Sequence, residues 1–261
     1  MGTVTVESIS LRFGKPGATE VVALDGLSMV IPDKQFAVIV GPSGCGKSSL
    51  LDVIAGLRDP SGGVCKMDGK VINGPGKDRG MVFQNYSLFP WLTVLRNVEF
   101  GLSLQGKAQA EITERARYYV NAVGLSSFEN AYPNQLSGGM KQRVAIARSL
   151  ANDPQVILMD EPFGALDSQT RVVMQQLLLG IWEKEHKTVL FVTHDIDEAL
   201  YLGEKVYVMS ARPGRIIDTI PVGFAHPRSY ELATSPEFIE LKRRIQHSLH
   251  AEVHKALSSA A

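Results

Sequence analysis

Short apolar runs and helical patterns alternate along the chain. Residues 36–40 (FAVIV), 156–159 (VILM) and 189–192 (VLFV) are wholly apolar. Such runs are typical of strands that are buried on both faces of a parallel sheet. A helical pattern, SLLDVIAGL, follows the first run directly after a glycine-rich loop. This alternation of strands and helices predicts an α/β core.

The N-terminal segment has the pattern of antiparallel strands. Residues 4–13 alternate in part between apolar and polar side chains. Residues 64–72 are predicted to form a hairpin that is closed by Asp68 and Gly69, because an Asp-Gly pair between two strand-like runs favours a tight turn. We therefore expect antiparallel β-structure before and after the glycine loop.

The middle and the C-terminal end of the chain have helical patterns. Apolar or small side chains recur at i, i+4, i+7, i+8 and i+11 from 112 to 123, and Gly124 ends the run. Residues 140–150 continue in the same style. A last amphipathic helix is predicted from Pro236 onward, and its apolar side consists of Phe238, Leu241, Ile245, Leu249 and Val253.

Composition narrows the class of protein. The 261 residues are 44% apolar, and 27 basic residues balance 27 acidic ones, so no net charge favours nucleic acid or anionic lipid. Two isolated cysteines, Cys45 and Cys65, form no disulfide framework and suit a reducing compartment. The first residues do not resemble a signal peptide, and the apolar runs are far shorter than a membrane-spanning helix. We expect a cytoplasmic protein whose membrane role, if any, comes through a partner.

The glycine-rich loop after residue 40 matches the complete G-x-x-x-x-G-K-S pattern. Its glycines allow successive N–H groups to surround phosphate oxygens, and the helix behind it adds its positive end. Lys47 is expected at the β- and γ-phosphates, and the Ser48 hydroxyl at Mg²⁺. The flanking strand and helix disfavour a chance GKS. The predicted phosphate-binding residues are Gly41, Pro42, Ser43, Gly44, Cys45, Gly46, Lys47, Ser48 and Ser49.

Two carboxylates follow the buried run 156–159. A carboxylate at the tip of such a strand can hold the Mg²⁺ shell, and Asp160 is assigned that role. Glu161 beside it can polarise the attacking water. A strand end followed by a plain turn is the alternative, which the phosphate-binding loop disfavours.

A second glycine pair suggests a second anion-binding turn. Ser137, Gly138 and Gly139 lead into a helical pattern, so their N–H groups can surround an anion. One nucleotide does not need two such turns from one chain, but two chains that face each other head to tail would use one from each. A GTPase is disfavoured because no N-K-x-D guanine motif is present.

These motifs together resemble the ATP-binding cassette (ABC) ATPases over nearly the whole chain. Residues 41–49 resemble Walker A, 136–140 the family signature and 156–160 Walker B; Met140 departs from the usual glutamine. The resemblance implies further roles: Gln84 as Mg²⁺ ligand and sensor, Glu161 as catalytic glutamate and Asp167 in the D-loop. His194 would contact the γ-phosphate, although a lone histidine is more often structural. Phe13 would stack on adenine, with a core position in its strand as the alternative.

The resemblance also implies a fold and a mechanism. The fold is a P-loop NTPase with a RecA-like core (1–84 and 151–230) that includes an antiparallel β subdomain, an inserted helical subdomain (85–150) and a C-terminal tail (231–261). Two copies would enclose two ATP molecules with Mg²⁺. Each site would combine Lys47, Gln84, Asp160, Glu161 and His194 of one copy with Ser137 and Gly139 of the other.

The partners follow from the connector, residues 85–97, which is rich in large apolar side chains. Exposed apolar segments suggest a docking surface, and the resemblance implies that this one meets an integral membrane permease. Phe89, Pro90 and Trp91 are the expected contacts; packing within the helical subdomain is the alternative. The permease would hold the chain at the cytoplasmic face of the inner membrane. A separate solute-binding protein would act indirectly, and no nucleic acid partner is expected.

The C-terminal part is similar to importers of the nitrate, sulfonate and taurine group, through ARPGRI (211–216), HPR (226–228) and SPEFIEL (235–241). An importer for another small organic solute and a non-transport ABC ATPase, such as one for iron–sulfur cluster assembly, remain alternatives. His247, His250 and His254 could hold a metal, but a solvated polar face is favoured. Cys45 is either a small space-filling residue or a reactive thiol.

Overall fold

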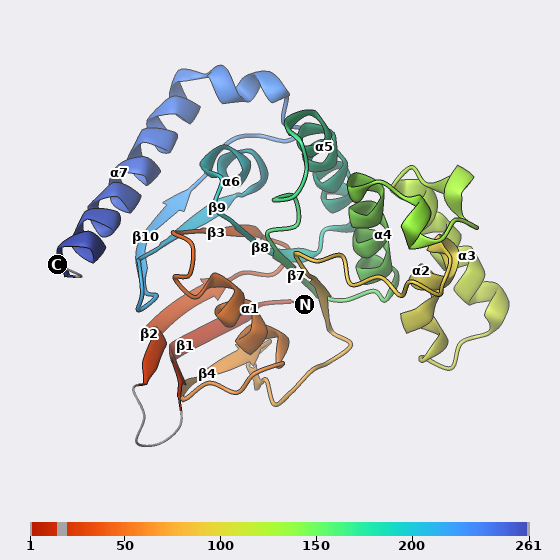
Figure 1. Ribbon diagram of the computed structural model, residues 1–261, viewed down its shortest axis with the longest axis horizontal. Coiled ribbons are helices and arrows are strands. Elements are labelled where there is room, and N and C mark those ends of the chain that lie inside the picture. Colours follow the sequence, from red (N-terminus) through yellow and green to blue (C-terminus); the bar gives the residue numbers. More distant parts are fainter. Residues whose placement is uncertain (1, 15–19, 260–261) are drawn as a thin grey trace. The chain divides into compact units, whose positions relative to one another are not determined.

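The computed structural model describes residues 2–14 and 20–259, with side chains to residue 252 (Figure 1). The chain forms two compact units. The first consists of Met1–Gly76 together with His186–Ala261, and the second of Lys77–Glu185. The segment 85–150 that is predicted to be helical lies within the second unit; the predicted division into core, insertion and tail stays a prediction.

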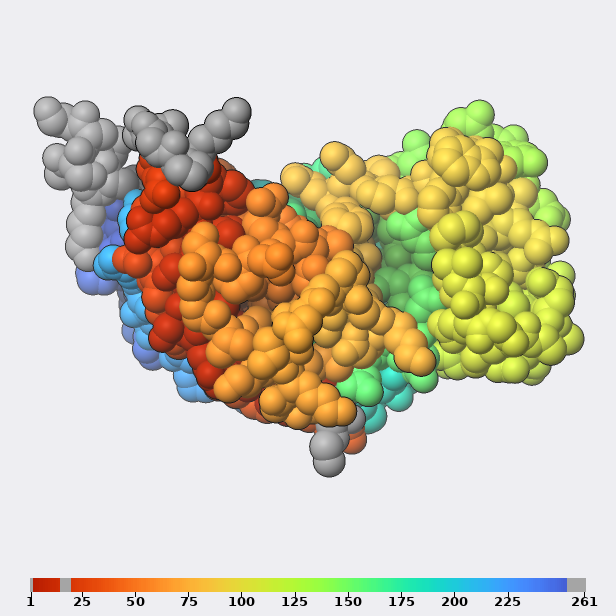
Figure 2. Space-filling view, turned by 90° about the horizontal axis from the view of Figure 1, so that it is seen from below, coloured from red at the N-terminus to blue at the C-terminus, as the bar shows by residue number. Residues whose placement is uncertain are grey.

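The first unit holds a four-stranded antiparallel sheet. The sheet has the order β2 (Val21–Ile31), β1 (Val4–Phe13), β4 (Gly62–Met67) and β5 (Lys70–Val71). In Figure 2, the orange segment that contains β4 and β5 lies beside the red N-terminal strands. The predicted hairpin is confirmed. Asp68 and Gly69 have φ values of 48° and 77°, which is the backbone that a tight two-residue hairpin turn requires.

Parallel strands of the first unit position the glycine loop. β3 (Phe36–Val40) pairs in parallel with β8 (Thr188–Thr193) on one side and β9 (Lys205–Met209) on the other. Every residue of β3 is buried, as the apolar run predicts. β10 (Ile216–Pro221) completes this part of the sheet, antiparallel to β9. The glycine loop therefore begins at the carboxyl end of a central strand.

Three α-helices of the first unit accompany these strands: α1 (Lys47–Ala55), α6 (Ile196–Leu202) and α7 (Pro236–Ser259), with the short η3 (Tyr230–Thr234) before α7. α7 begins at Pro236 as predicted and packs on α6 and β9. Phe238 and Ile245 of its apolar side are fully buried, whereas Leu241 and Leu249 are half-buried. The side chain of Val253 lies outside the described residues.

The second unit combines a parallel strand pair with helices. β6 (Arg79–Val82) pairs with β7 (Val156–Asp160). The helices α2 (Val94–Ser103), α3 (Gln109–Ala122) and α4 (Gly138–Ala151) pack on one another. The other elements are η1 (Ser126–Phe128), η2 (Pro133–Gln135) and α5 (Ser168–Glu185). The predicted helix at 112–123 starts three residues earlier, at Gln109. Gly124, which was predicted to end it, has left-handed backbone, as is common after a helix end.

No helix within the described part of the chain has the length and apolar character that crossing a membrane requires.

Candidate functional site

The glycine loop joins β3 to α1 through two residues with left-handed backbone. Gly44 has φ 74° and Gly46, the N-cap of α1, has φ 108°. A Cβ on Gly46 would lie 2.9 Å from Leu24 Cδ2 and 3.0 Å from the Ala23 carbonyl oxygen, so only glycine fits there. No side chain caps α1. The first N–H groups of this helix therefore belong to the loop, in the arrangement that binds anions at helix N-termini.

Two donors of the loop converge on one carbonyl group, that of Pro42. Lys47 is only 5% exposed, and its Nζ donates to the Gly41 carbonyl at 2.9 Å and to the Pro42 carbonyl at 3.1 Å. The Cys45 N–H also points to the Pro42 carbonyl, at 3.4 Å. A cation and an N–H group thus share one small region, as an anion-binding loop requires.

Cys45 is a small buried residue of this loop. Its side chain is 1% exposed, and a Cβ on Gly41 would lie 3.0 Å from Cys45 Sγ. This close packing favours the space-filling interpretation of Cys45 over the reactive thiol, because a reactive thiol needs access to solvent.

The other two candidate residues of the first unit lie at strand ends. His194 follows β8 directly and is exposed, and Asp195 behind it caps α6 by accepting the Asp197 and Glu198 N–H groups at 2.9 and 3.1 Å. Phe13 ends β1 and is half-buried, with the Arg58 guanidinium 4.9 Å from its ring centroid. Phe13 is therefore not a fully buried core residue, and its stacking on adenine stays a prediction.

The second unit carries the two acidic candidates at one strand end. Asp160 is the last residue of β7 and is half-buried. Glu161 follows with φ 42°, in the left-handed region that non-glycine residues seldom occupy. Backbone strain of this kind is concentrated at functional sites. Gln84, two residues after β6, is exposed.

The serine–glycine segment forms the N-terminus of α4. The Ser137 hydroxyl accepts the Met140 N–H at 3.3 Å and so caps the helix. Gly138 and Gly139 are its first two residues, and a Cβ on Gly139 would lie 2.8 Å from Thr170 Cγ2. The predicted second anion-binding turn therefore coincides with a helix N-terminus, two residues before the predicted helix start at 140.

Asp167 has a structural role that the sequence analysis did not identify. Its carboxylate accepts the N–H groups of Thr170 at 3.0 Å and Gln169 at 3.1 Å, at the start of α5. Hydrogen bonds from the Thr170 backbone and side chain hold the pKa of Asp167 below its usual value. The side chain is exposed, and its predicted place at the nucleotide stays a prediction.

The connector is partly ordered by buried polar groups. Asn97 is fully buried, accepts the Phe89 N–H at 2.9 Å and donates to the Phe89 and Leu92 carbonyls. Arg148 of α4 donates to the carbonyls of Ser87 and Tyr86 at 2.7 and 3.2 Å, and burial lowers its pKa. Sequence patterns gave no signal for either anchor.

The aromatic residues of the connector differ in exposure. The ring of Phe89 lies 4.4 Å from that of Phe100 and 5.7 Å from that of Trp91, and Phe89 is half-buried. Trp91 is 70% exposed, and Pro90 is exposed too. Packing within the unit therefore accounts for Phe89, but not for Trp91.

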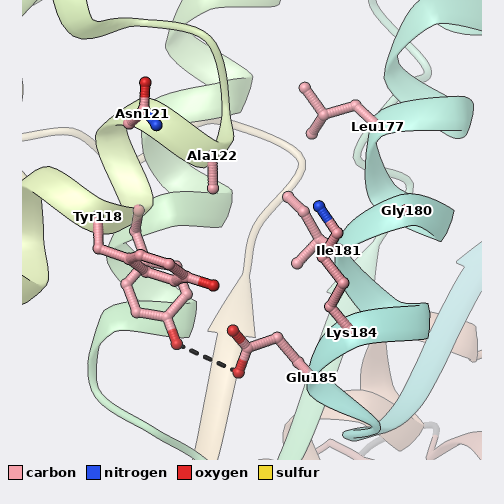
Figure 3. A pocket seen from close by; sticks show the side chains of 9 residues that line it. Tyr118, Asn121, Ala122, Leu177, Gly180, Ile181, Lys184 and Glu185 are labelled. Carbon is pink, nitrogen blue, oxygen red and sulfur yellow. Dashed lines mark hydrogen bonds between the residues drawn. The ribbon is translucent and has the colours of Figure 1, made fainter.

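A separate cavity of about 370 Å³ lies between α3 and α5 (Figure 3). The Tyr119 hydroxyl donates to Glu185 Oε2 at 3.3 Å, and burial together with that carboxylate raises the pKa of Tyr119 well above its usual value. Tyr119 is thus a neutral donor at physiological pH. None of the residues predicted to bind nucleotide lines this cavity; its wall includes Tyr118, Asn121, Leu177, Ile181 and Lys184.

Two of the three C-terminal histidines have described side chains. His247 and His250 are exposed on α7, and the side chain of His254 lies outside the described residues. Among the side chains that the structure describes, no group of three His, Cys, Asp or Glu residues is placed to hold a metal ion.

Comparison with known proteins gives close matches. Residues 24–164 match the family described as ABC transporter. The chain is 50% identical to the nitrate import ATP-binding protein of Synechocystis sp., with 90% of each chain covered. It is 47% identical to the taurine import ATP-binding protein of Rhizobium johnstonii, over 94% of this chain and 96% of the relative.

A solved dimeric ATP-binding cassette, in a post-hydrolysis state bound to ADP and Pi, has the same fold. It is 36% identical with a TM-score of 0.75, and the match covers 85% of this chain and 100% of that chain. These comparisons confirm the predicted fold class and the family resemblance.

Proposed function

The chain belongs to the ABC transporter family, and from that premise we propose that it is the ATP-hydrolysing subunit of a bacterial importer. Members of this family that serve transport hydrolyse ATP, and this chain is an ATPase. The observation that carries the residue-level proposal is the loop at 41–49, where Lys47 Nζ and the Cys45 N–H converge beside the Pro42 carbonyl. We assign this loop to the ATP phosphates.

We propose three residues as Mg²⁺ ligands. Ser48 offers a hydroxyl, Gln84 an amide oxygen and Asp160 a carboxylate. Mg²⁺ prefers such oxygen donors together with phosphate oxygens and water, so the donor set fits. The bound metal ion would neutralise charge on the β- and γ-phosphates.

Glu161 is proposed to accept the proton of the attacking water. The left-handed backbone of Glu161 supports this role, because strained backbone is concentrated at functional sites. Here it changes the direction of the chain directly after Asp160, where β7 ends. Lys47 and His194 would stabilise charge at the γ-phosphate, and Phe13 would stack on the adenine. Hydrolysis then rests on positioning and charge stabilisation rather than on a covalent intermediate.

A second copy of the chain is proposed to complete each site. The Ser137 hydroxyl and the N–H groups of Gly138 and Gly139 lie at the N-terminus of α4, which suits a γ-phosphate presented from outside the chain. Asp167 would lie near the same junction. The dimeric state of the solved cassette supports this arrangement.

An integral membrane permease is the partner that we propose for the connector. The exposed ring of Trp91 beside Pro90 offers the apolar contact that such a partner would bury. Docking there would hold the chain at the cytoplasmic face of the inner membrane. A separate solute-binding protein would act only through the permease.

The proposed solute is a small oxyanion or organic acid of the nitrate or taurine type, and this proposal rests on the names of two similar proteins. Importers of other small organic solutes and non-transport ABC ATPases are the alternatives. Recovery of tagged chain from detergent extracts discriminates between them: a multi-span membrane protein supports transport, and soluble partners alone contradict it.

The variant Glu161→Gln tests the proposed mechanism. Gln keeps the size of the side chain but cannot accept the proton, so we expect ATP affinity within about twofold of the original and hydrolysis lowered by about 100-fold or more. Equilibrium binding of a fluorescent ATP analogue and phosphate release measure the two quantities. Near-normal phosphate release would remove Glu161 from the mechanism.

A further inference from the structure

The turn between β9 and β10, residues 210–215, is a rigid element of the first unit. Ser210 is 5% exposed; its hydroxyl donates to the Pro213 carbonyl and accepts the Arg215 N–H, each at 2.9 Å. The Ser210 N–H donates to the Arg215 carbonyl, also at 2.9 Å. A buried hydroxyl that bridges both arms of the turn fixes its shape.

The same turn is also fixed to β2. The Gly214 N–H donates to the Ala23 carbonyl at 2.8 Å, and the Asp25 N–H donates to the Gly214 carbonyl at 3.2 Å. The side chains of Arg215 and Asp25 add an ion pair at the outer edge. The turn is therefore held on one side by a strand of the antiparallel sheet.

Two consecutive carbonyl groups of the phosphate-binding loop face this turn. The Arg212 guanidinium donates to the Gly44 carbonyl oxygen through Nε at 3.2 Å and Nη2 at 3.0 Å. A Cβ on Gly214 would lie 2.3 Å from the Cys45 carbonyl oxygen and 2.1 Å from Met209 Cε. Glycine at 214 therefore lets the backbone of the turn approach the loop closely.

The Arg212 contact determines which way one peptide group faces. In a planar trans peptide, the C=O and N–H groups point in opposite directions. Because the Arg212 guanidinium holds the Gly44 carbonyl, the N–H of Cys45 must point away from that guanidinium. It does so, toward the Pro42 carbonyl, which also accepts from Lys47 Nζ. The Gly44 carbonyl that Arg212 contacts and the Cys45 N–H are the two ends of the same peptide group.

We propose that Arg212 is a positioning residue of the phosphate-binding loop, which holds the 44–45 peptide so that the Cys45 N–H faces the nucleotide phosphates. This inference rests on the proposed assignment of the loop to ATP. It gives a role to the ARPGRI segment, which otherwise carried only a family resemblance. Arg212 contacts the carbonyl end of this peptide, and the phosphates would contact the backbone that Arg212 orients.

Variants of two neighbouring arginines test the proposal. Arg212→Met removes both donors and keeps an unbranched, mostly apolar side chain, and Arg212→Gln keeps a donor but removes the charge. Arg215→Met is the matched control, because Arg215 lies in the same turn, is also exposed, and pairs with Asp25 instead of the loop. Affinities for ATP and ADP, KM, kcat and the unfolding temperature without nucleotide are measured for each.

We expect Arg212→Met to weaken ATP and ADP alike by about fivefold, the effect of losing one hydrogen-bonded contact. KM should rise by the same factor, with kcat within about twofold. Arg212→Gln should recover part of the affinity, Arg215→Met should bind normally, and both Met variants should unfold at the same temperature.

Two results overturn the proposal. One is unchanged binding by Arg212→Met; if kcat and the unfolding temperature fall at the same time, Arg212 has only a structural role. The other is equal weakening by Arg215→Met, which indicates a general charge effect. A different result would show that the proposed function itself is wrong. In that case Lys47→Ala would bind ATP normally, whatever the arginine variants do.

Discussion

Two helices of this protein begin at glycine-rich turns, and their N-termini are built differently. α1 follows Gly46, which has left-handed backbone, and no side chain caps it. α4 follows Ser137, which has extended backbone and whose hydroxyl accepts the Met140 N–H. The first terminus is thus made of backbone and a buried lysine, and the second of backbone and an exposed hydroxyl.

The difference between these two helix N-termini indicates two ways of binding the phosphates of a nucleotide. The loop before α1 turns back on itself, so its donors converge beside the Pro42 carbonyl, and it can surround phosphate oxygens from several sides. The turn before α4 offers a serine hydroxyl and the first N–H groups of a helix. The first suits a resident nucleotide of the same copy, and the second suits a nucleotide that another copy brings.

The largest expected effect is at the first terminus. Lys47→Ala removes the only side-chain cation within the loop sequence, so we expect hydrolysis to fall by about 1,000-fold and ATP affinity to fall with it. Phosphate release and equilibrium ATP binding measure both. Lys66→Ala is the control, since Lys66 pairs with Glu7 on the first unit and lies outside the loop. Normal turnover by Lys47→Ala would contradict the assignment of the loop before α1 to the ATP phosphates.

The second terminus should respond differently. Ser137→Ala is expected to lower hydrolysis by about 100-fold, because a donor to the γ-phosphate is lost, while ATP binding by the isolated chain stays unchanged. The loss of the cap should also cost about 1 kcal/mol of stability. Hydrolysis, ATP binding and urea unfolding separate these effects.

Ser235→Ala separates capping from ATP chemistry. The Ser235 hydroxyl accepts the Phe238 N–H at 3.2 Å at the start of α7, so this variant also loses a serine cap of a helix. We expect a similar loss of stability with normal hydrolysis. If Ser235→Ala lowered hydrolysis as much as Ser137→Ala, instability alone would explain both.

A third helix N-terminus gives the smallest expected effect. Asp167 caps α5 with a carboxylate whose pKa is held below its usual value, so its stabilising effect is present at neutral pH. The effect is lost as the pH falls below the usual carboxyl pKa of about 4 and through the lowered value. Asp167→Asn should therefore be less stable than the original at pH 7, and the difference should shrink at pH 3. Urea unfolding at both pH values measures it, and a constant difference would contradict the assignment.

Local patterns predicted the parts of this molecule that local chemistry determines. The buried strand β3, the glycine loop and α1 follow one another in sequence, and the Asp68–Gly69 turn needs only its two residues. The start of α4 was predicted two residues late, at 140, because the periodic apolar side chains begin after the glycines. The Ser137 cap marks the true start.

Non-local contacts could not be predicted in the same way. β9 and β10 were not predicted. β9 (KVYVM) begins with a lysine instead of forming a wholly apolar run, and its burial comes from pairing with β3, more than 160 residues earlier in the chain. The Arg212 contact with Gly44 spans 168 residues. The left-handed backbone of Glu161 also gave no signal, since glycine is the usual marker of that conformation.

The central claim is that the two termini act on one nucleotide from different copies. Mixing the Lys47→Ala and Ser137→Ala chains and measuring phosphate release tests it most directly. In a mixed pair, one site would carry both changes and the other neither, so the mixture should regain a substantial part of the original activity that each variant lacks alone. If both termini act within one copy, every site keeps one defect, and a mixture no more active than the separate variants would contradict the claim.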